Sequence, residues 1–277
     1  MTHKSAGFIG GGRVTRILLG GLKRAGQMPG QVVVSDGNAE TLSKLKAAFP
    51  EIVVAPGDNR QAAAQDIVFL ALPPAAVGGL LGEIKDCLTP ASILVSLAPK
   101  WSIAKLAEGL GGFQKIARMI PNAPSIVGAG YSPVAFSAGL TAAERAELAG
   151  MWSALGECPE VAEDKLEAYA ILTAMGPTYL WFQLYELQAI GRSFGLTPQE
   201  IEAGIAAMTL GAVKTMAESG LAPEAVMDLI PSKPLGEDEP IVKADCSTRT
   251  SCCPKRGSMS FPDRIRSGLI SPTTSTS

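Results

Sequence analysis

The chain contains a single histidine, His3, among its 277 residues, and this scarcity excludes several kinds of catalytic site. Ser-His-Asp triads, Cys-His dyads and histidine-ligated metal centres all require an imidazole placed within the fold. Of the five cysteines, Cys87 and Cys158 stand alone and three crowd near the carboxyl terminus, which is no pattern of structural disulfides. The sequence therefore predicts no metal site and no histidine-dependent nucleophile.

The chain also lacks a large excess of charge of either sign, because its 24 Lys and Arg and 26 Asp and Glu give a formal net charge of -2. Without a broad basic surface, nothing attracts nucleic acid phosphates or anionic lipids. The uncharged run at residues 168–185 is interrupted by Gly176-Pro177 and has no basic flank, so we interpret it as a buried interface helix. No secretory signal precedes the first glycine-rich segment, and we predict a cytoplasmic protein without nucleic acid or membrane partners.

Short apolar runs alternate with helical segments through the first half of the chain. The predicted helices cover residues 13–25, 39–48, 59–65 and 75–87, and the predicted strands cover residues 6–9, 31–35, 52–55, 66–72, 91–97, 114–119 and 134–137. Strands separated by helices of about 10 to 15 residues indicate a parallel sheet with right-handed crossovers. The predicted fold class is therefore α/β, with a doubly wound, Rossmann-type N-terminal domain.

From Thr141 to about residue 230 the sequence is helical in character. Two capping boxes, Thr141 with Glu144 and Thr197 with Glu200, mark helix starts. We predict an NAD(P)-binding domain at 1–155, an all-α dimerisation and substrate domain at 156–242, and a disordered or non-native tail at 243–277, which is rich in Ser, Thr and Pro.

A glycine-rich turn, Gly10-Gly11-Gly12-Arg13-Val14, joins the first predicted strand to the first predicted helix. In a dinucleotide fingerprint the first glycine permits the tight turn and the second lets the backbone approach the pyrophosphate. The helix N-terminus then offers N–H groups and its positive dipole end to the anion. This placement predicts dinucleotide binding, with a glycine-rich turn that holds no ligand as the alternative.

The second predicted strand ends in Ser35-Asp36, about 20 residues beyond the fingerprint, where an acid can accept a hydrogen bond from the ribose 2′-OH. A carboxylate would repel a 2′-phosphate, and Gly37 supplies no cation to hold one. Asp36 therefore favours NADH within a predicted NAD(P)H cofactor. The alternative is that Asp36-Gly37 is only a turn pair.

Further cofactor contacts are expected at the carboxyl ends of the other strands, where doubly wound sheets bind ligands. These candidates are Leu72, Pro73, Pro74, Ser96, Ala98, Pro121 and Asn122. The prolines fix the backbone, and the Asn122 amide can donate and accept hydrogen bonds near the nicotinamide. The alternative interpretation makes these residues strand terminators, with Asn122 capping a turn in a rigid interdomain connector.

Four blocks of sequence carry a more specific signal, at residues 7–12 with 18–22, 66–74, 118–124 and 175–179. The third reads Arg-Met-Ile-Pro-Asn-Ala-Pro, and the fourth reads Met-Gly-Pro-Thr-Tyr. On these blocks the chain resembles the pyrroline-5-carboxylate reductases, the last enzymes of proline biosynthesis, whose motifs are R-x-M-P-N-T-P and G-S-G-P-A-Y. The 118–124 block is the most diagnostic of the four.

The resemblance implies hydride transfer from NAD(P)H to a cyclic imine carboxylate by a homodimer or higher homo-oligomer. Such chemistry suits a chain with one histidine, because the iminium can take its proton from water while the protein aligns the reactants. The candidate substrate holders are the backbone at Gly176 and Pro177 and the hydroxyls of Thr173 and Thr178. We expect the apolar residues of the same segment, Leu172, Leu180, Leu184, Leu187 and Ile190, to be buried in an intertwined dimer.

The chain departs from the family pattern on the substrate side. The family lysine before the strand-four proline is Pro73 here, the serine of G-S-G-P-A-Y is lost, and the P-G-G-T-T turn has no counterpart near residues 228–235. Two alternatives therefore stay open. One is a nucleotide-binding regulatory or scaffold dimer without turnover, and the other is a deazaflavin-linked NADP oxidoreductase that shares the nucleotide domain.

Overall fold

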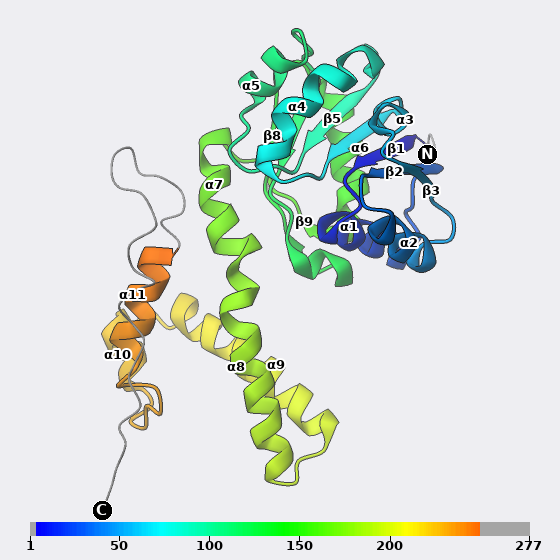
Figure 1. Ribbon diagram of the computed structural model, residues 1–277. Coiled ribbons are helices and arrows are strands. Elements are labelled where there is room, and N and C mark those ends of the chain that lie inside the picture. The colour runs from blue at the N-terminus through cyan, green and yellow to red at the C-terminus, as the bar shows by residue number, and fades with distance from the viewer. Residues whose placement is uncertain (1–3, 250–277) are drawn as a thin grey trace, which may run out of the picture. The chain divides into compact units, whose positions relative to one another are not determined.

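A seven-stranded sheet organises the first part of the chain in the computed structural model, which describes residues 4–249, with side chains described through residue 244 (Figure 1). The strand order is β3-β2-β1-β4-β5-β6-β8, with β8 antiparallel to β6 and the other neighbours parallel. The strands are β1 Ser5–Ile9, β2 Gln31–Asp36, β3 Val53–Pro56, β4 Ile67–Leu70, β5 Ile93–Ser96, β6 Ile116–Met119 and β8 Val134–Phe136. This topology confirms the predicted doubly wound α/β fold.

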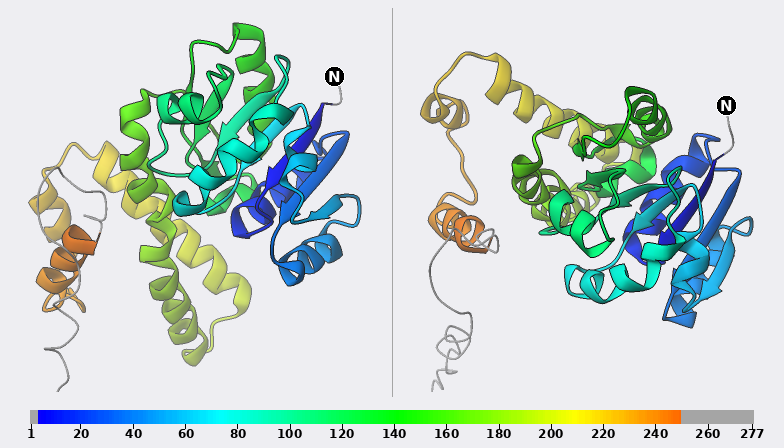
Figure 2. Two further views of the ribbon diagram at one scale, coloured as in Figure 1. Left: turned by 45° about the horizontal axis from the view of Figure 1, so that its top comes forward. Right: turned by 90° about the horizontal axis from the view of Figure 1, so that it is seen from above.

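Helices cover both faces of the sheet (Figure 2). Helices α1, α2 and α6 pack on one face, and α3, α4 and α5 on the other. Their bounds are α1 Arg13–Arg24, α2 Ala39–Ala48, α3 Asn59–Ala63, α4 Pro74–Ile84, α5 Ile103–Gly109 and α6 Ala142–Trp152. Because side chains alternate along a strand, Phe8 and Ile9 of β1 enter opposite cores.

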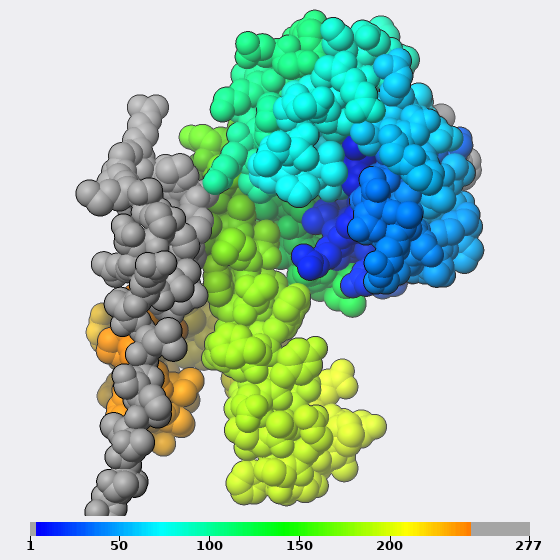
Figure 3. Space-filling view, viewed as in Figure 1, coloured from blue at the N-terminus to red at the C-terminus, as the bar shows by residue number. Residues whose placement is uncertain are grey.

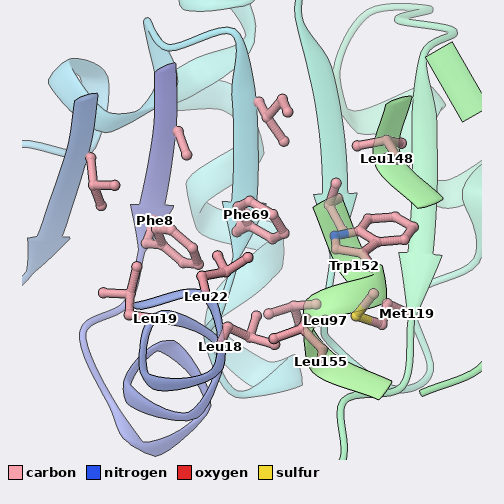
Figure 4. Packing of buried hydrophobic residues seen from close by; sticks show 14 of the residues in the cluster. Phe8, Leu18, Leu19, Leu22, Phe69, Leu97, Met119, Leu148, Trp152 and Leu155 are labelled. Atoms are coloured by element: carbon pink, nitrogen blue, oxygen red, sulfur yellow. The ribbon is translucent and has the colours of Figure 1, made fainter. Parts of the chain in front are cut away.

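The core under α1 and α6 is the larger and contains most of the buried aromatic residues (Figure 4). The rings of Phe8 and Phe69 from adjacent strands stack with centroids 4.5 Å apart, and Trp152 of α6 lies 1% exposed in the same cluster. Burial on this scale stabilises a side chain by about 1.5 to 3 kcal/mol, which fixes the sheet that positions the strand ends.

The helical second half of the chain contains the two predicted capping boxes and a π-helix that was not predicted. Both capping boxes form, with the Glu144 and Glu200 carboxylates accepting from the N–H groups of Thr141 and Thr197. After the short α7, Leu166–Tyr169, a π-helix at Ala170–Ala174 leads into α8, Gly176–Ser193. α9 follows at Pro198–Glu218, α10 at Pro223–Asp228 and α11 at Glu239–Arg249.

Three short elements were absent from the sequence prediction. These are α5 and the two strands of a small second sheet, β7 Gly130–Tyr131 and β9 Gly156–Glu157. α5 has seven residues and each of these strands has two, which is too short for a hydrophobic period to register.

The chain divides into two compact units between Thr209 and Leu210. The first unit runs past the boundary expected at residue 155 because Leu166 is buried against Ile120 and Ala135 of the sheet region. The assignment of 156–242 as a separate domain stays a prediction. α11 also continues to Arg249, so the tail expected to be disordered from residue 243 begins as a helix; His3, Cys252 and Cys253 lie outside the described residues.

Within residues 4–249, no helix combines the length and apolar character needed to cross a bilayer. The uncharged run at 168–185 forms the π-helix and the first half of α8 instead. Its apolar side chains are exposed in the single chain, with Leu172 69% and Phe182 67% accessible. The single chain therefore does not bury the face that the sequence predicts to be an interface.

Candidate functional site

Gly10 begins the glycine-rich turn in a conformation that side chains rarely adopt. Its φ is +106°, and a Cβ at this position would lie 2.4 Å from the Ala71 carbonyl oxygen at the end of β4. The Gly10 N–H donates to the Ser35 carbonyl at 2.7 Å, while its own carbonyl accepts from the Thr15 hydroxyl. Contacts to β2, β4 and α1 therefore fix the turn, and only glycine fits there.

Gly12 stands at the N-cap of α1 and leaves the helix end open. It has no side chain to cap the first turn, and among residues 4–249 no heavy atom outside its neighbours lies within 4 Å of an added Cβ. The first N–H groups of a helix need an outside partner, and the helix dipole makes an anion the favoured one. In the space-filling view the dark blue segment that includes this turn lies recessed between the cyan of α4 and the blue of α2 (Figure 3).

Arg13 and Val14, on the first turn of α1, have different surroundings. Arg13 is exposed, where its charge adds to the positive end of the helix, whereas Val14 packs against the core. The open, uncapped N-terminus and the adjacent cation fit the pyrophosphate of a dinucleotide.

Asp36 already has two backbone partners in the protein. Its Oδ2 accepts from the Gly11 N–H and its Oδ1 from the Asn38 N–H, both at 2.8 Å. A carboxylate has about four acceptor sites, so a ribose hydroxyl can still bind. The neighbouring Ser35 is buried and donates to Asn59 Oδ1 at 2.8 Å, which directs its hydroxyl into the protein.

The ends of β4 and β5 lie beside this turn. Leu72 contacts the position that a Gly10 Cβ would take, and Pro73 and Pro74 start α4. Ser96 and Ala98 are both buried, and the Ser96 hydroxyl accepts from the Ala98 N–H at 3.4 Å. The structure thus brings the residues predicted at the two strand ends to one edge of the sheet, and their contacts with a cofactor stay predictions.

Asn122 connects the sheet to the helical half. It is 5% exposed; its Nδ2 donates to the Thr173 carbonyl, and its Oδ1 accepts from the Tyr131 N–H at 3.3 Å. Both ends of the amide are thus engaged in the protein, which matches the connector interpretation. With Pro121 before it, Asn122 joins the end of β6 to the π-helix, and the contact to nicotinamide stays a prediction.

The predicted substrate holders are mostly occupied within their own helices. The Thr173 hydroxyl donates to the Tyr169 carbonyl at 3.0 Å, and the Thr178 hydroxyl donates to the Met175 carbonyl at 2.6 Å. Because the π-helix runs directly into α8, Gly176 and Pro177 do not follow a loop, and the Thr178 N–H already donates to Met175. These hydroxyls keep acceptor capacity but must rotate to donate to a carboxylate.

An ion-pair network around a buried arginine lies beside these elements and was not predicted from the sequence. Arg118 of β6 is 3% exposed and donates to Glu163 Oε1 at 3.0 Å and to Glu167 Oε1 at 2.8 Å. The same two oxygens accept from the backbone N–H groups of Ile103 and Lys100. An arginine in a buried strand requires anionic partners, so the position of Arg118 in a predicted strand could have indicated an ion pair. The sequence does not reveal which acidic residues are the partners.

Comparisons with known proteins identify a matching family model and several relatives. Residues 5–100 match the family model described as NADP oxidoreductase, coenzyme F420-dependent. A pyrroline-5-carboxylate reductase of Escherichia coli is 31% identical over 232 residues, covering 82% of this chain and 85% of the relative. That of Corynebacterium melassecola is 30% identical over 219 residues, covering 78% and 80%.

Solved structures of the same enzyme class are similar over almost the whole fold. A reductase from Coxiella burnetii matches with a TM-score of 0.64 at 27% identity, covering 90% of this chain and 92% of that one. The Plasmodium falciparum enzyme, solved with NADP bound, matches with a TM-score of 0.70 at 20% identity and shares the fold. The chain belongs to the pyrroline-5-carboxylate reductase family.

Proposed function

We propose that the protein is an NAD(P)H-dependent reductase that acts on the C=N bond of a cyclic imine carboxylate of the pyrroline-5-carboxylate type. The observation that carries the proposal is the open N-terminus of α1 at Gly12, held in place by the tight turn at Gly10, in a chain of this family. Bound NAD(P)H supplies the hydride that adds to the imine carbon, and the imine nitrogen takes its proton from water.

The residues of the chain bind and align the reactants rather than donate protons. The N–H groups at the start of α1 and the Arg13 cation hold the pyrophosphate. The reacting half of the cofactor then rests against the ends of β4 and β5, where Leu72 is apolar and partly exposed. Alignment of two reactants in a protected site supplies much of the rate enhancement in such a reaction.

NADH preference is part of the proposal. The Asp36 carboxylate is fixed beside the glycine-rich turn by Gly11 and Asn38, at the strand end where the adenosine ribose binds in this fold. The 2′-phosphate of NADPH would lie next to the Asp36 carboxylate, which is held in place, so NADPH binds less well than NADH.

We also propose that the active form is at least a homodimer in the cytoplasm. The support for association is the apolar surface of the π-helix and α8, where Phe182, Tyr185 and Leu172 are each about two-thirds exposed. Monomeric proteins rarely expose apolar patches larger than a few hundred Å². A second copy of the chain that covers this surface would remove the unfavourable exposure of these apolar side chains to water.

Turnover of pyrroline-5-carboxylate by the purified full-length chain tests the proposal. We expect loss of reduced nicotinamide absorbance in step with formation of the saturated amine, and no turnover by the Gly12→Asp variant. Tight cofactor binding without oxidation across a panel of cyclic imines and ketones would instead support a regulatory or scaffold dimer.

A deazaflavin-linked reaction is the second candidate, because the family model that matches residues 5–100 describes coenzyme F420-dependent proteins. A reduced deazaflavin would then exchange hydride with NADP in place of an imine. Mixing the protein with NADP and a reduced deazaflavin, and following both absorbance bands, separates the two candidates.

A further inference from the structure

The loop between β5 and α5, residues 97–102, lies at the ligand-binding edge of the sheet, and we call it the β5 loop. It begins after Ser96, and its Leu97 N–H donates to the Leu70 carbonyl at the end of β4, at 3.0 Å. The glycine-rich turn follows β1, and the order β1-β4-β5 puts the β5 loop two strands further along the same edge. With the pyrophosphate at the β1 turn, the reacting half of a dinucleotide extends over β4 towards the β5 loop.

The structure holds the β5 loop on the side of α4. The Trp101 Nε1 donates to the Pro74 carbonyl at 2.8 Å, which joins the loop to the first turn of α4. The backbone of Lys100, beside Trp101, has a φ of 68°, in the left-handed region that glycine favours. The loop therefore has a defined backbone shape that depends on contacts from outside it.

Two carboxylates hold the β5 loop on its other side. The Lys100 N–H donates to Glu167 Oε1 at 2.8 Å, and the N–H of Ile103, the first residue of α5, donates to Glu163 Oε1 at 2.7 Å. A carboxylate at the start of a helix is also favoured by the helix dipole. Backbone N–H groups at and just after the end of the loop thus take their positions from Glu163 and Glu167.

Arg118 of β6 fixes these two carboxylates relative to each other. Its guanidinium donates to Glu163 Oε1 at 3.0 Å and to Glu167 Oε1 at 2.8 Å, the same two oxygens that accept from the backbone. A guanidinium carries its donors in one rigid plane, so a single arginine can orient both acceptors.

The segment that carries the two carboxylates also leads to the predicted substrate residues. Glu167 lies in α7, which continues into the π-helix at Ala170–Ala174. Asn122, which follows β6, donates to the Thr173 carbonyl in that π-helix. The segment at 163–173 is therefore tied to the β5 loop at one end and to the end of β6 at the other. A shift of this segment would move the predicted substrate residues relative to the β5 loop.

Stability alone is a poor explanation for Arg118. Its side chain is 4% exposed, whereas those of Glu163 and Glu167 are 33% and 29% exposed. Arg118 Nε and Glu167 Oε2 are buried without a hydrogen-bond partner among the residues whose side chains are described. Apolar residues of similar volume often replace a buried ion pair without loss of stability. Orientation of a loop beside a reaction site accounts better for a buried cation here.

We propose that Arg118 is a positioning residue for hydride transfer, which acts through Glu163 and Glu167 to hold the β5 loop against the segment at 163–173 and so aligns the nicotinamide with the imine. This inference rests on the proposed imine reductase function. Loss of this alignment slows hydride transfer, while the adenosine and pyrophosphate part of the cofactor, two strands away at the Gly12 turn, binds as before.

Four variants test the proposal. Arg118→Met removes the cation, and Glu167→Ala removes the acceptor of the Lys100 N–H from a partly exposed position, where the fold tolerates the change better. Glu167→Gln keeps an oxygen acceptor and is the conservative variant. Glu160→Ala is the matched control, because Glu160 is the carboxylate of a different arginine pair, with Arg145.

Two measurements separate alignment from binding and from folding. The first is the Kd for ADP-ribose, which contains the adenosine and pyrophosphate but no nicotinamide, measured by calorimetry. The second is the single-turnover rate constant for hydride transfer from NADH to pyrroline-5-carboxylate with both reactants saturating. Partial unfolding lowers the amplitude of a single turnover but leaves its rate constant unchanged, so the rate constant reports the geometry of folded molecules.

We expect Glu167→Ala and Arg118→Met to lower this rate constant about tenfold to 100-fold, with the Kd for ADP-ribose changed less than about twofold. Glu167→Gln should recover most of the rate, and Glu160→Ala should match wild type. If Arg118→Met does not fold, Glu167→Ala and its rescue by Glu167→Gln decide the outcome.

A rate constant for Glu167→Ala within about threefold of wild type overturns the positioning role and leaves the reductase function intact. An equal loss of ADP-ribose binding also overturns it, because the variant then disturbs the whole cofactor site. A wild-type protein that transfers no hydride to the imine overturns the proposed function and this inference with it.

Discussion

The Asp36 carboxylate accepts a hydrogen bond from the Gly11 N–H at 2.8 Å, which joins the end of β2 to the glycine-rich turn. The same side chain therefore shapes the turn and sets the charge next to the cofactor ribose. Asp36→Asn retains an oxygen acceptor for the Gly11 N–H but removes the charge and the acceptor for the Asn38 N–H, so the contact with the turn and the charge can be separated.

We expect Asp36→Asn to lower the ratio of kcat/KM for NADH over NADPH by about tenfold, because repulsion of the 2′-phosphate is relieved. Asp36→Ala removes both roles and should weaken binding of both dinucleotides. Steady-state kinetics with each cofactor measures the ratio, and an unchanged ratio in Asp36→Asn would show that the carboxylate does not select the cofactor.

Gly12→Asp should separate binding from folding. The space around Gly12 is open, so the new side chain fits, and aspartate is a better N-cap than glycine by roughly a few tenths of a kcal/mol. Its charge nevertheless occupies the pyrophosphate position, and we expect the Kd for NADH to rise about 100-fold or more at an unchanged melting temperature.

Gly10→Ala serves as the contrasting variant, because a Cβ there meets the Ala71 carbonyl at 2.4 Å in a left-handed conformation. We expect it to destabilise the fold measurably by thermal unfolding. Tight NADH binding by Gly12→Asp would contradict the placement of the pyrophosphate.

Local patterns in the sequence were sufficient to predict the sheet and the cofactor turn. The alternation around Phe8 and the spacing of Gly10 and Gly12 depend on contacts between near neighbours and on strand period. The capping box at Thr141 is likewise local, and the structure forms it.

The rest of the site depends on contacts distant in sequence. Arg118 meets Glu163 and Glu167 across 45 and 49 residues, and no spacing rule selects those acids over others nearby. Lys100, whose N–H donates to Glu167, has a φ of 68°, and no residue pattern in the sequence indicates this conformation. The hydrogen bond from Asn122 to the Thr173 carbonyl in the π-helix spans 51 residues, so it has no local sequence signal either.

Replacement of Arg118 tests the energetics of the network. Arg118→Met removes the buried cation from two carboxylates that are about a third exposed. Loss of one member of a fully buried pair costs about 3 to 5 kcal/mol of unfolding free energy, and because water reaches these two carboxylates we expect a loss at or below the lower end of that range. Arg145→Met removes a partly exposed pair with Glu160 together with hydrogen bonds to the Leu140 and Ser137 carbonyls, and it should still cost less than Arg118→Met because Arg145 is about a third exposed.

Combining Arg118→Met with Glu163→Gln and Glu167→Gln should recover part of the loss, since no charge is then left unpaired. Denaturant unfolding measures all of these variants. A loss for Arg118→Met no larger than that for Arg145→Met would contradict the account of the network.

Glu144 links stability to acid pH. The Lys115 ammonium, followed by the Thr141 cap, lowers the pKa of Glu144 from 4.5 to about 2. A depressed folded pKa contributes stability that is fully present above the unfolded value near 4.5 and is lost as the pH falls through about 2. Glu144→Gln should therefore cost about 1 to 2 kcal/mol at pH 7 and much less near pH 2.

Urea unfolding of wild type and Glu144→Gln across this range measures the difference. Glu200 closes the second capping box, where hydrogen bonds from the Thr197 backbone and side chain lower its pKa without a lysine nearby in the described part of the chain. Glu200→Gln is therefore the matched control and should show a smaller difference. A constant penalty for Glu144→Gln from pH 7 to pH 2 would exclude the ionised carboxylate as its cause.

Phe182 gives the most direct test of the proposed association. It is 67% exposed on α8, next to Trp181 at 45% and one helical turn from Tyr185 at 67%. A charge placed in an apolar interface loses its hydration without gaining a partner, so Phe182→Glu should shift the protein from dimer to monomer at micromolar concentration. Gln183→Glu, on the same helix, introduces the same charge at a polar position and should leave the oligomer intact.

Sedimentation velocity measures both variants. A monomeric wild type would contradict the proposed dimer, and a dimeric Phe182→Glu protein would place the interface elsewhere. Because α8 follows directly from the π-helix that Asn122 contacts, we expect the monomeric variant to lose imine turnover while it keeps NADH binding at the distant turn of Gly12.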